Sequence, residues 1–116
     1  MIYLASPYSH PDPRVREARF DAACRATAVL VRAGHAVIAP IVLGHPLVRY
    51  GVPGDWSFWE PMAREQLACC DELVVLRLDG WRESVGVQAE IAEAAELGKP
   101  LRFLDPVQTN IEQVMP

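Results

Sequence analysis

The sequence predicts one α/β domain built on a parallel sheet that is covered by helices on both faces. Apolar strand segments alternate with helical segments along the chain. Each strand segment is too apolar for a half-exposed antiparallel sheet, even though Arg77 falls within residues 73–78, so the sheet is expected to be buried on both faces. The 116 residues suffice for a single core, so we expect one domain over residues 1–116 and a sheet of four or five strands.

The first strand is predicted at Ile2–Ala5 and ends in a loop over residues 6–12. Asp12 suits the N-cap of the following helix, and Pro13 suits its first position. Apolar residues then recur at helical spacing until Gly34, which fits the position after the last helical residue.

A second apolar strand is predicted over residues 35–39 and ends at Pro40. Residues 41–55 contain several glycines and prolines, so we expect an irregular segment there. A fifth strand would have to lie within residues 41–50, or it is absent. Long irregular segments in small domains usually serve function or an interface.

The second half of the chain repeats the alternation. A helix is predicted over residues 57–70, a strand over 73–78 and a helix from Ser84 to residue 97. A fourth strand follows at Leu101–Leu104, and residues 109–114 fit a short closing helix.

Composition and charge exclude several classes of protein. Hydrophobic residues make up 51% and charged residues 22%, as in ordinary globular proteins. The net charge is −4 and the basic residues are scattered, which disfavours binding to a nucleic-acid polymer. No apolar run approaches the roughly 20 residues that span a bilayer. The chain opens directly on a strand, so we expect a cytoplasmic protein without membrane contact.

Cofactor and metal motifs are lacking. The three cysteines include an adjacent pair and form no Cys-x-x-Cys motif, so they indicate buried thiols. The loop after the first strand lacks the glycine pattern of a dinucleotide fold and the lysine of a P-loop. The sequence therefore predicts neither a cofactor nor a bound metal.

A functional site is expected at the carboxyl ends of the strands, where ligands bind to open parallel sheets. Three loops should meet there, over residues 6–12, 40–55 and 79–84. The first carries Ser6, Pro7 and Tyr8.

The start of the last long helix carries the most informative pattern. Ser84 suits an N-cap, and Gly86 leaves the first turn open to a ligand at the positive end of the helix dipole. Glu90 lies one turn further on the same side. The alternative is that Glu90, Glu93 and Glu96 form an ordinary solvated helix face.

Aromatic residues follow the long irregular segment. Trp56, Phe58 and Trp59 either stack on a base, or belong to the core or to an oligomer interface. His45 precedes a proline in a predicted site loop and is a candidate ligand contact.

Two segments together carry a resemblance that covers nearly the whole chain. Residues 4–10 read Leu-Ala-Ser-Pro-Tyr-Ser-His, and residues 80–86 contain Gly-Trp-Arg, Ser84 and Gly86. These segments resemble the nucleoside 2-deoxyribosyltransferase-like superfamily, and in particular a small subfamily of it. The resemblance implies a flavodoxin-like three-layer sandwich, and enzymes that transfer or hydrolyse nucleosides and nucleotides.

The resemblance also implies residue roles. A glutamate at the position of Glu90 is the nucleophile that attacks the anomeric carbon of the sugar. Serine at position 84, with the helix amides behind it, resembles the members that cleave monophosphates, where it helps to hold the 5′-phosphate. The expected catalytic residues are Glu90 and Asp79. The expected substrate-binding residues are Ser6, Pro7, Tyr8, His45, Arg82, Ser84, Val85 and Gly86.

Two positions depart from the superfamily pattern. Active members have an aspartate, which protonates the leaving base, eight residues before the acidic residue that opens the third strand. Here that acidic residue is Asp71, and Ala63 stands eight residues earlier. Asp79, Asp55 and Tyr8 are the alternatives for this acid. The second departure is Gln88, at a position where many members have glycine.

Three hypotheses about function follow. The first is an N-glycosidase or deoxyribosyltransferase-like enzyme that acts on a nucleoside 5′-monophosphate or a related nucleotide. The second is a non-catalytic domain that binds or senses nucleotides, which Ala63 favours. The third is an oligomeric assembly protein with a vestigial pocket. In each case we expect a homo-oligomer, either a dimer or a tetramer.

Overall fold

Four parallel strands form the sheet of the computed structural model, which describes residues 1–106. Their order across the sheet is β2-β1-β3-β4, so the two outer strands lie on opposite sides of the central pair. Ile2 of β1 is in register with Val37 on one side and Glu72 on the other. The strands are β1 (Ile2–Ala5), β2 (Val37–Ile38), β3 (Glu72–Leu76) and β4 (Leu101–Leu104).

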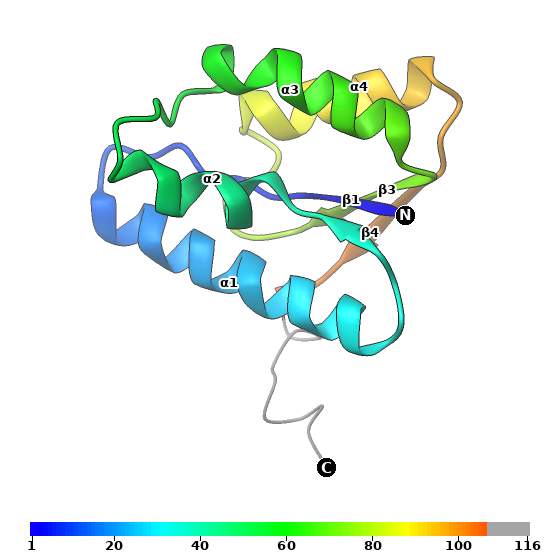
Figure 1. Ribbon diagram of the computed structural model, residues 1–116, viewed down its shortest axis with the longest axis horizontal. Helices are drawn as coiled ribbons and strands as arrows, with labels where there is room; N and C mark the ends of the chain where they lie inside the picture. Colours follow the sequence, from blue (N-terminus) through cyan, green and yellow to red (C-terminus); the bar gives the residue numbers. More distant parts are fainter. Residues whose placement is uncertain (107–116) are drawn as a thin grey trace.

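Four helices flank this sheet in the described part of the chain. They are α1 (Pro13–Arg32), α2 (Pro40–Val48), α3 (Trp56–Cys69) and α4 (Val85–Glu96). Helix α1 lies on one side of the sheet, and α3 and α4 lie side by side on the other (Figure 1). The predicted fold class is confirmed, because this is a flavodoxin-like three-layer α/β sandwich.

The core is divided between the two faces of the sheet. Side chains alternate along β1, so Tyr3 and Ala5 pack toward α3 and α4, whereas Ile2 and Leu4 pack toward α1. Leu73 and Val75 of β3 share the first face. All of β1 is buried, which explains why its sequence is apolar throughout.

The predicted helix caps at the ends of α1 and at the start of α4 are confirmed. The Asp12 side chain accepts a hydrogen bond from the Arg14 amide, and Pro13 is the first residue of α1. Gly34 follows the helix with a φ of 96°, a conformation that suits glycine. At α4, the Ser84 hydroxyl accepts a hydrogen bond from the Val87 amide over 3.2 Å.

The prediction for residues 41–55 was wrong in its first part, because Pro40–Val48 forms helix α2 and no fifth strand lies there. Pro40 occupies the first helical position, where its missing N–H costs nothing. Gly44 packs against the Trp59 ring, and a Cβ at that glycine would lie 3.0 Å from the indole. Tertiary packing of this kind outweighs the low helix propensity of Gly44 and Pro46.

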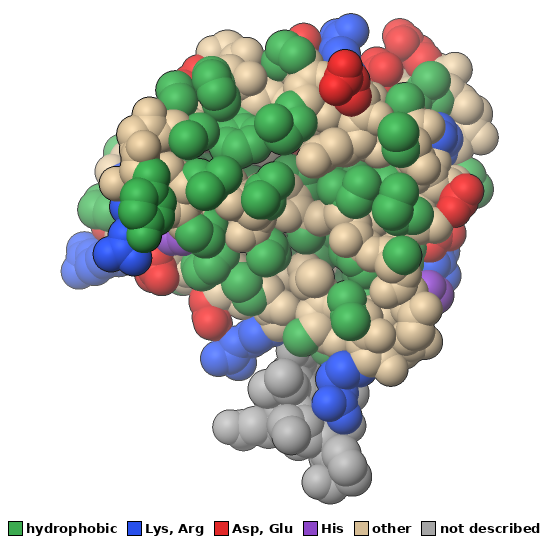
Figure 2. Space-filling model, in the orientation of Figure 1, with side chains coloured by type: hydrophobic (Ala, Val, Ile, Leu, Met, Phe, Trp, Pro, Cys, Tyr) green, Lys and Arg blue, Asp and Glu red, His purple; other side chains and the backbone are tan. Residues whose placement is uncertain are grey.

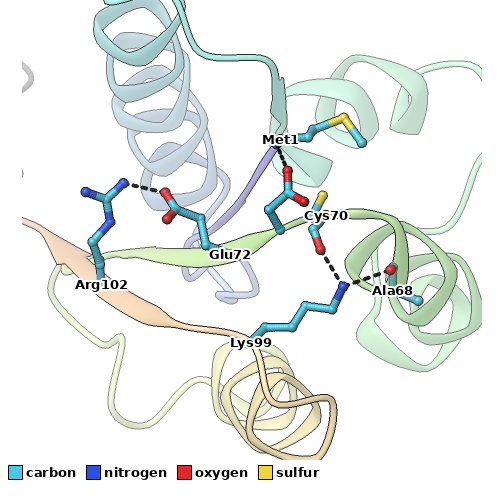
Figure 3. A network of polar contacts seen from close by, with 7 residues as sticks. Met1, Ala68, Cys70, Glu72, Lys99 and Arg102 are labelled. Carbon is cyan, nitrogen blue, oxygen red and sulfur yellow. Dashed lines mark hydrogen bonds and ion pairs between the residues drawn. The ribbon is translucent and has the colours of Figure 1, made fainter.

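Polar contacts hold together the amino-terminal end of the sheet (Figure 3). The Lys99 ammonium donates hydrogen bonds to the carbonyls of Ala68, over 2.8 Å, and Cys70, at the end of α3. The N-terminal amine pairs with Asp71, as Figure 3 also shows. Hydrogen bonds and an ion pair therefore stabilise the amino-terminal end of the sheet. The predicted site lies at the opposite, carboxyl-terminal end.

Within residues 1–106, no helix is long and apolar enough to cross a membrane. The short helix predicted over residues 109–114 lies outside the described residues.

Candidate functional site

A cavity of about 610 Å³ opens at the carboxyl ends of β1 and β3, as the strand order predicts. The three loops expected to meet there all contribute to its wall, together with residues of α2, α3 and α4. Seven of the predicted site residues line it: Ser6, Tyr8, His45, Ser84, Val85, Gly86 and Glu90.

Three predicted site residues are not part of the cavity wall. Pro7 is fully buried. Asp79 is exposed, and its backbone carbonyl accepts a hydrogen bond from Arg19 over 3.1 Å. The Arg82 guanidinium lies over the Trp81 ring, 5.2 Å from its centroid. The structure therefore brings neither the Asp79 carboxylate nor the Arg82 side chain to the cavity.

Glu90 is the buried carboxyl group of the cavity, with an exposed fraction of 7%. None of the ion pairs within residues 1–106 includes it. Burial raises the pKa of Glu90 to about 7, and the nearby Tyr3 hydroxyl acts in the opposite direction. Glu90 thus differs from Glu96 on the same helix, which is exposed. The solvated-face interpretation is wrong for Glu90.

Tyr3 is a functional candidate that sequence reasoning missed. Its hydroxyl is the one buried side-chain polar atom of the described residues without a hydrogen-bond partner. The hydroxyl lies beside the Glu90 carboxyl, and the pKa of Tyr3 is raised by burial and then by the Glu90 charge. The two groups do not meet in hydrogen-bonding geometry. A buried hydroxyl without a hydrogen-bond partner lowers the stability of the folded protein. Such groups are typical of residues that serve function.

The first turn of α4 lies at the cavity, where Val85 and Gly86 form part of the wall. The first amides of a helix have no partner within it and favour anions. Part of the space at Gly86 is taken by Trp56, because a Cβ there would lie 3.1 Å from the indole. Gly86 therefore serves close packing as well as access to the amides.

A chain of hydrogen bonds runs along another side of the cavity. The Tyr8 hydroxyl lies 2.7 Å from Nδ1 of His45, and Nε2 of His45 lies 2.6 Å from the Glu17 carboxylate. Phe20 stacks on the His45 ring with centroids 4.3 Å apart. Glu17 and Phe20 lie three residues apart on α1, so one face of this helix holds the imidazole.

Arg19 is the second residue that the sequence did not reveal. Its guanidinium donates to the carbonyls of Ser9, over 2.9 Å, and Asp79, and thereby joins two of the site loops. Arg19 also lines the cavity. Within residues 1–106, it is the one Lys or Arg residue in the cavity wall. Helix α1 is rich in arginine, so no sequence signal singles out this position.

Ala63 lies where the resemblance leads one to expect an acid. It is buried on α3 and lines the cavity. Ala63 and Glu90 also border a smaller cavity of about 60 Å³ between α3 and α4. A longer side chain at position 63 would therefore meet the surroundings of Glu90. Trp56 and Trp59 line the main cavity, whereas Phe58 is exposed.

Residues 1–106 hold no group of three His, Cys, Asp or Glu side chains that could bind a metal ion.

Comparison with known proteins assigns a family. No curated protein matches the chain. The family described as "Domain of unknown function (DUF1937)" matches residues 1–105, a range that includes every strand, every described helix and the whole cavity wall. The chain belongs to this DUF1937 family.

Proposed function

We propose that this protein is an N-glycosidase or a deoxyribosyltransferase-like enzyme that cleaves the N-glycosidic bond of a nucleoside 5′-monophosphate or a related nucleotide. The observation that carries the proposal is Glu90, a buried carboxyl without a charged partner in the wall of a large cavity. Such groups are uncommon outside functional sites, because burial of an ionisable group costs free energy.

Glu90 suits the role of nucleophile in glycosyl transfer. Its carboxylate attacks the anomeric carbon as the base departs, and water or a second base then releases the sugar from Glu90. With its pKa raised to about 7, Glu90 can supply the carboxylate near neutral pH. The Tyr3 hydroxyl lies where it favours the ionised form.

The cavity wall offers matching contacts for a nucleotide. Its volume of about 610 Å³ lies in the range of small-molecule sites. The rings of Trp56 and Trp59 provide apolar surface for a base. The α4 amides and the Arg19 guanidinium provide donors for a phosphate, which is a chemistry that both groups favour. The proposal also includes a cytoplasmic location.

The proposal includes a homo-oligomer, a dimer or a tetramer. Large apolar side chains are exposed on α2, α3 and the first turn of α4, including Leu43, Val48, Phe58 and Val85. Figure 2 shows hydrophobic side chains gathered on this face. A second copy that covers them would also close the cavity. Light scattering after gel filtration tests this, and a monomer at micromolar concentration would contradict it.

A non-catalytic nucleotide-binding domain is the second candidate. Ala63 favours it, because the wall beside Glu90 has no second carboxyl at that position. This candidate predicts that nucleotides raise the melting temperature without being cleaved.

One experiment separates the two candidates. The protein is incubated with a panel of nucleosides and nucleotides, and free base is followed by chromatography. We expect base release that Glu90→Gln abolishes and that the control Glu96→Gln, at an exposed position of the same helix, keeps. Release that survives Glu90→Gln would remove Glu90 from the mechanism. Thermal stabilisation by a nucleotide without any release would favour the binding domain.

A further inference from the structure

We propose that Tyr8, His45 and Glu17 form a proton relay, in which Tyr8 donates the proton that the departing base needs. This inference rests on the proposed glycosidase function and supplies the general acid that Ala63 leaves missing. The relay joins the loop after β1 to helices α1 and α2.

Both ring nitrogens of His45 have a hydrogen-bond partner. Nδ1 lies 2.7 Å from the Tyr8 hydroxyl and Nε2 lies 2.6 Å from the Glu17 carboxylate. The stacked Phe20 ring, at an interplanar angle of 27°, fixes the plane of the imidazole. An imidazole held on three sides in this way is not free to rotate, so its proton exchange with Tyr8 takes place at Nδ1.

The relay leads from solvent to the cavity. The Glu17 side chain is 67% exposed, whereas the His45 side chain is 19% exposed. Tyr8 and His45 both line the cavity, and Glu17 does not. The Tyr8 end therefore faces a ligand, whereas the Glu17 end faces solvent and holds the imidazole in place.

Two protonation states of the relay differ by one proton. A carboxylate is an acceptor only, so Glu17 keeps a proton on Nε2 of His45 in both states. In the neutral imidazole, Nδ1 accepts a hydrogen bond from Tyr8. In the imidazolium, Nδ1 donates to the Tyr8 oxygen, and the hydroxyl proton is free to point into the cavity.

The proton balance follows from these two states. In the first step the Glu90 oxygen bonds to the anomeric carbon and the C–N bond breaks. The base nitrogen takes the Tyr8 proton, and Tyr8 takes the Nδ1 proton of the imidazolium. In the second step water attacks the anomeric carbon and the bond to Glu90 breaks. The water proton passes to Tyr8 while the Tyr8 proton returns to Nδ1.

Tyr8 is better placed for this role than the other candidates. The Asp79 carboxylate is not part of the cavity wall, and the same holds for Asp55. Burial raises the pKa of Tyr8, against the opposing effect of Arg16, and Glu17 adds to the increase. The hydroxyl therefore stays protonated, so it can only donate if the imidazolium replaces its proton at the same time.

The test compares two leaving groups on the same sugar phosphate. One substrate is the nucleotide that the protein cleaves fastest. The other carries 4-nitrophenol in place of the base, because 4-nitrophenolate departs without protonation. We expect Tyr8→Phe to slow release of the base by about 100-fold or more and to change release of nitrophenolate less than about threefold. His45→Gln and Glu17→Gln should show the same selectivity, with smaller losses.

Controls distinguish the relay from the proposed function. Glu90→Gln should stop both reactions, and Tyr50→Phe, an exposed tyrosine outside the cavity wall, should change neither. An equal loss on both substrates in Tyr8→Phe, or no loss on either, would overturn the relay while leaving Glu90 in place. If the unchanged protein cleaves neither substrate, the proposed function fails and the relay with it.

A measurement on the unchanged protein needs no variant. Long-range ¹H–¹⁵N NMR reports which nitrogen of a histidine carries the proton. We expect the neutral imidazole of His45 to carry its proton on Nε2, which faces the Glu17 carboxylate. A neutral His45 with its proton on Nδ1 would overturn the relay whatever the variants show.

Discussion

The buried Tyr3 hydroxyl lies beside the Glu90 carboxyl where β1 packs against α4, and the two groups influence each other without a well-formed hydrogen bond. Burial dominates at Glu90 and favours the neutral acid, whereas Tyr3 favours the carboxylate. The protonation state of Glu90 is therefore balanced close to neutral pH. Stability and activity should both depend on this balance.

The first prediction concerns stability. Glu90 has a pKa of about 7 in the folded protein and an ordinary value near 4.5 when unfolded. The folded state therefore binds more protons between these values, and stability should fall as pH rises from about 4.5 to 7. The loss attributable to Glu90 should reach about 3 kcal/mol above pH 7. Urea denaturation at pH 5 and pH 8 measures it.

Glu90→Gln keeps the shape of the side chain and removes the titration. It should be more stable than the unchanged protein at pH 8, and its advantage should shrink at pH 5. Glu96→Gln, at an exposed position of the same helix, is the control and should keep the original pH dependence. An unchanged pH dependence in Glu90→Gln would contradict the burial of a titrating carboxyl.

The second prediction concerns Tyr3→Phe. Loss of the hydroxyl leaves the effect of burial on Glu90 unopposed, so the pKa of Glu90 should rise. In the profile of kcat/KM against pH, the acid limb should move to higher pH. At pH values on the acid side of the profile, base release should fall about fivefold. Carbon NMR of the Glu90 carboxyl gives the same shift without turnover. A downward shift would show that the hydroxyl acts in some other way.

Much of this architecture follows from sequence patterns that are local. Asp12 and Gly34 mark the ends of α1, and Ser84 marks the start of α4, because helix caps need particular side chains or backbone conformations. Once α4 begins at Ser84, the position of Glu90 one turn beyond Gly86 follows from helix geometry. The location of the site could therefore be predicted from these patterns together with the general rule that ligands bind at the carboxyl ends of parallel strands.

The remaining features depend on contacts between distant parts of the chain. Helix α2 contains Gly44 and Pro46, and it depends on the Trp59 ring that fills the space at Gly44. His45 and Glu17 are 28 residues apart, so no pattern within either segment shows that they meet. Tyr3 reads as a core residue, because its strand is apolar and its hydroxyl finds a role only beside Glu90.

The third prediction compares two glycines with positive φ. Gly34 and Gly80 have φ values of 96° and 91°, so alanine at either should cost about 1 kcal/mol of stability. A Cβ at Gly34 meets no atom within 4 Å, whereas one at Gly80 would lie 2.6 Å from the Arg19 guanidinium. Only Gly80→Ala should therefore displace Arg19 and weaken nucleotide binding, measured by calorimetry. Equal binding by both variants would remove Arg19 from the ligand contacts.

The fourth prediction concerns the opposite end of the sheet. Lys99 donates to the Ala68 and Cys70 carbonyls at the end of α3, where a positive charge also suits the helix dipole. Lys99→Met should lower the free energy of unfolding by about 1–2 kcal/mol. Base release per folded molecule should stay the same, because Lys99 lies outside the cavity wall. A loss of activity larger than the loss of folded protein would contradict this separation.

The fifth prediction adds an acid at position 63. Ala63 and Glu90 border the same cavities, so the carboxyl of Ala63→Asp would lie in the surroundings of Glu90. Two neighbouring carboxyls share a proton, and the protonated one can serve the departing base. We expect base release to rise at least tenfold in Ala63→Asp and to recover in the double variant with Tyr8→Phe. The side chain in Ala63→Asn has nearly the same size as that in Ala63→Asp but carries no acidic proton. Ala63→Asn should therefore neither raise base release nor restore it in combination with Tyr8→Phe. Equal effects of the aspartate and asparagine variants would show that space at position 63, and not proton donation, limits the reaction.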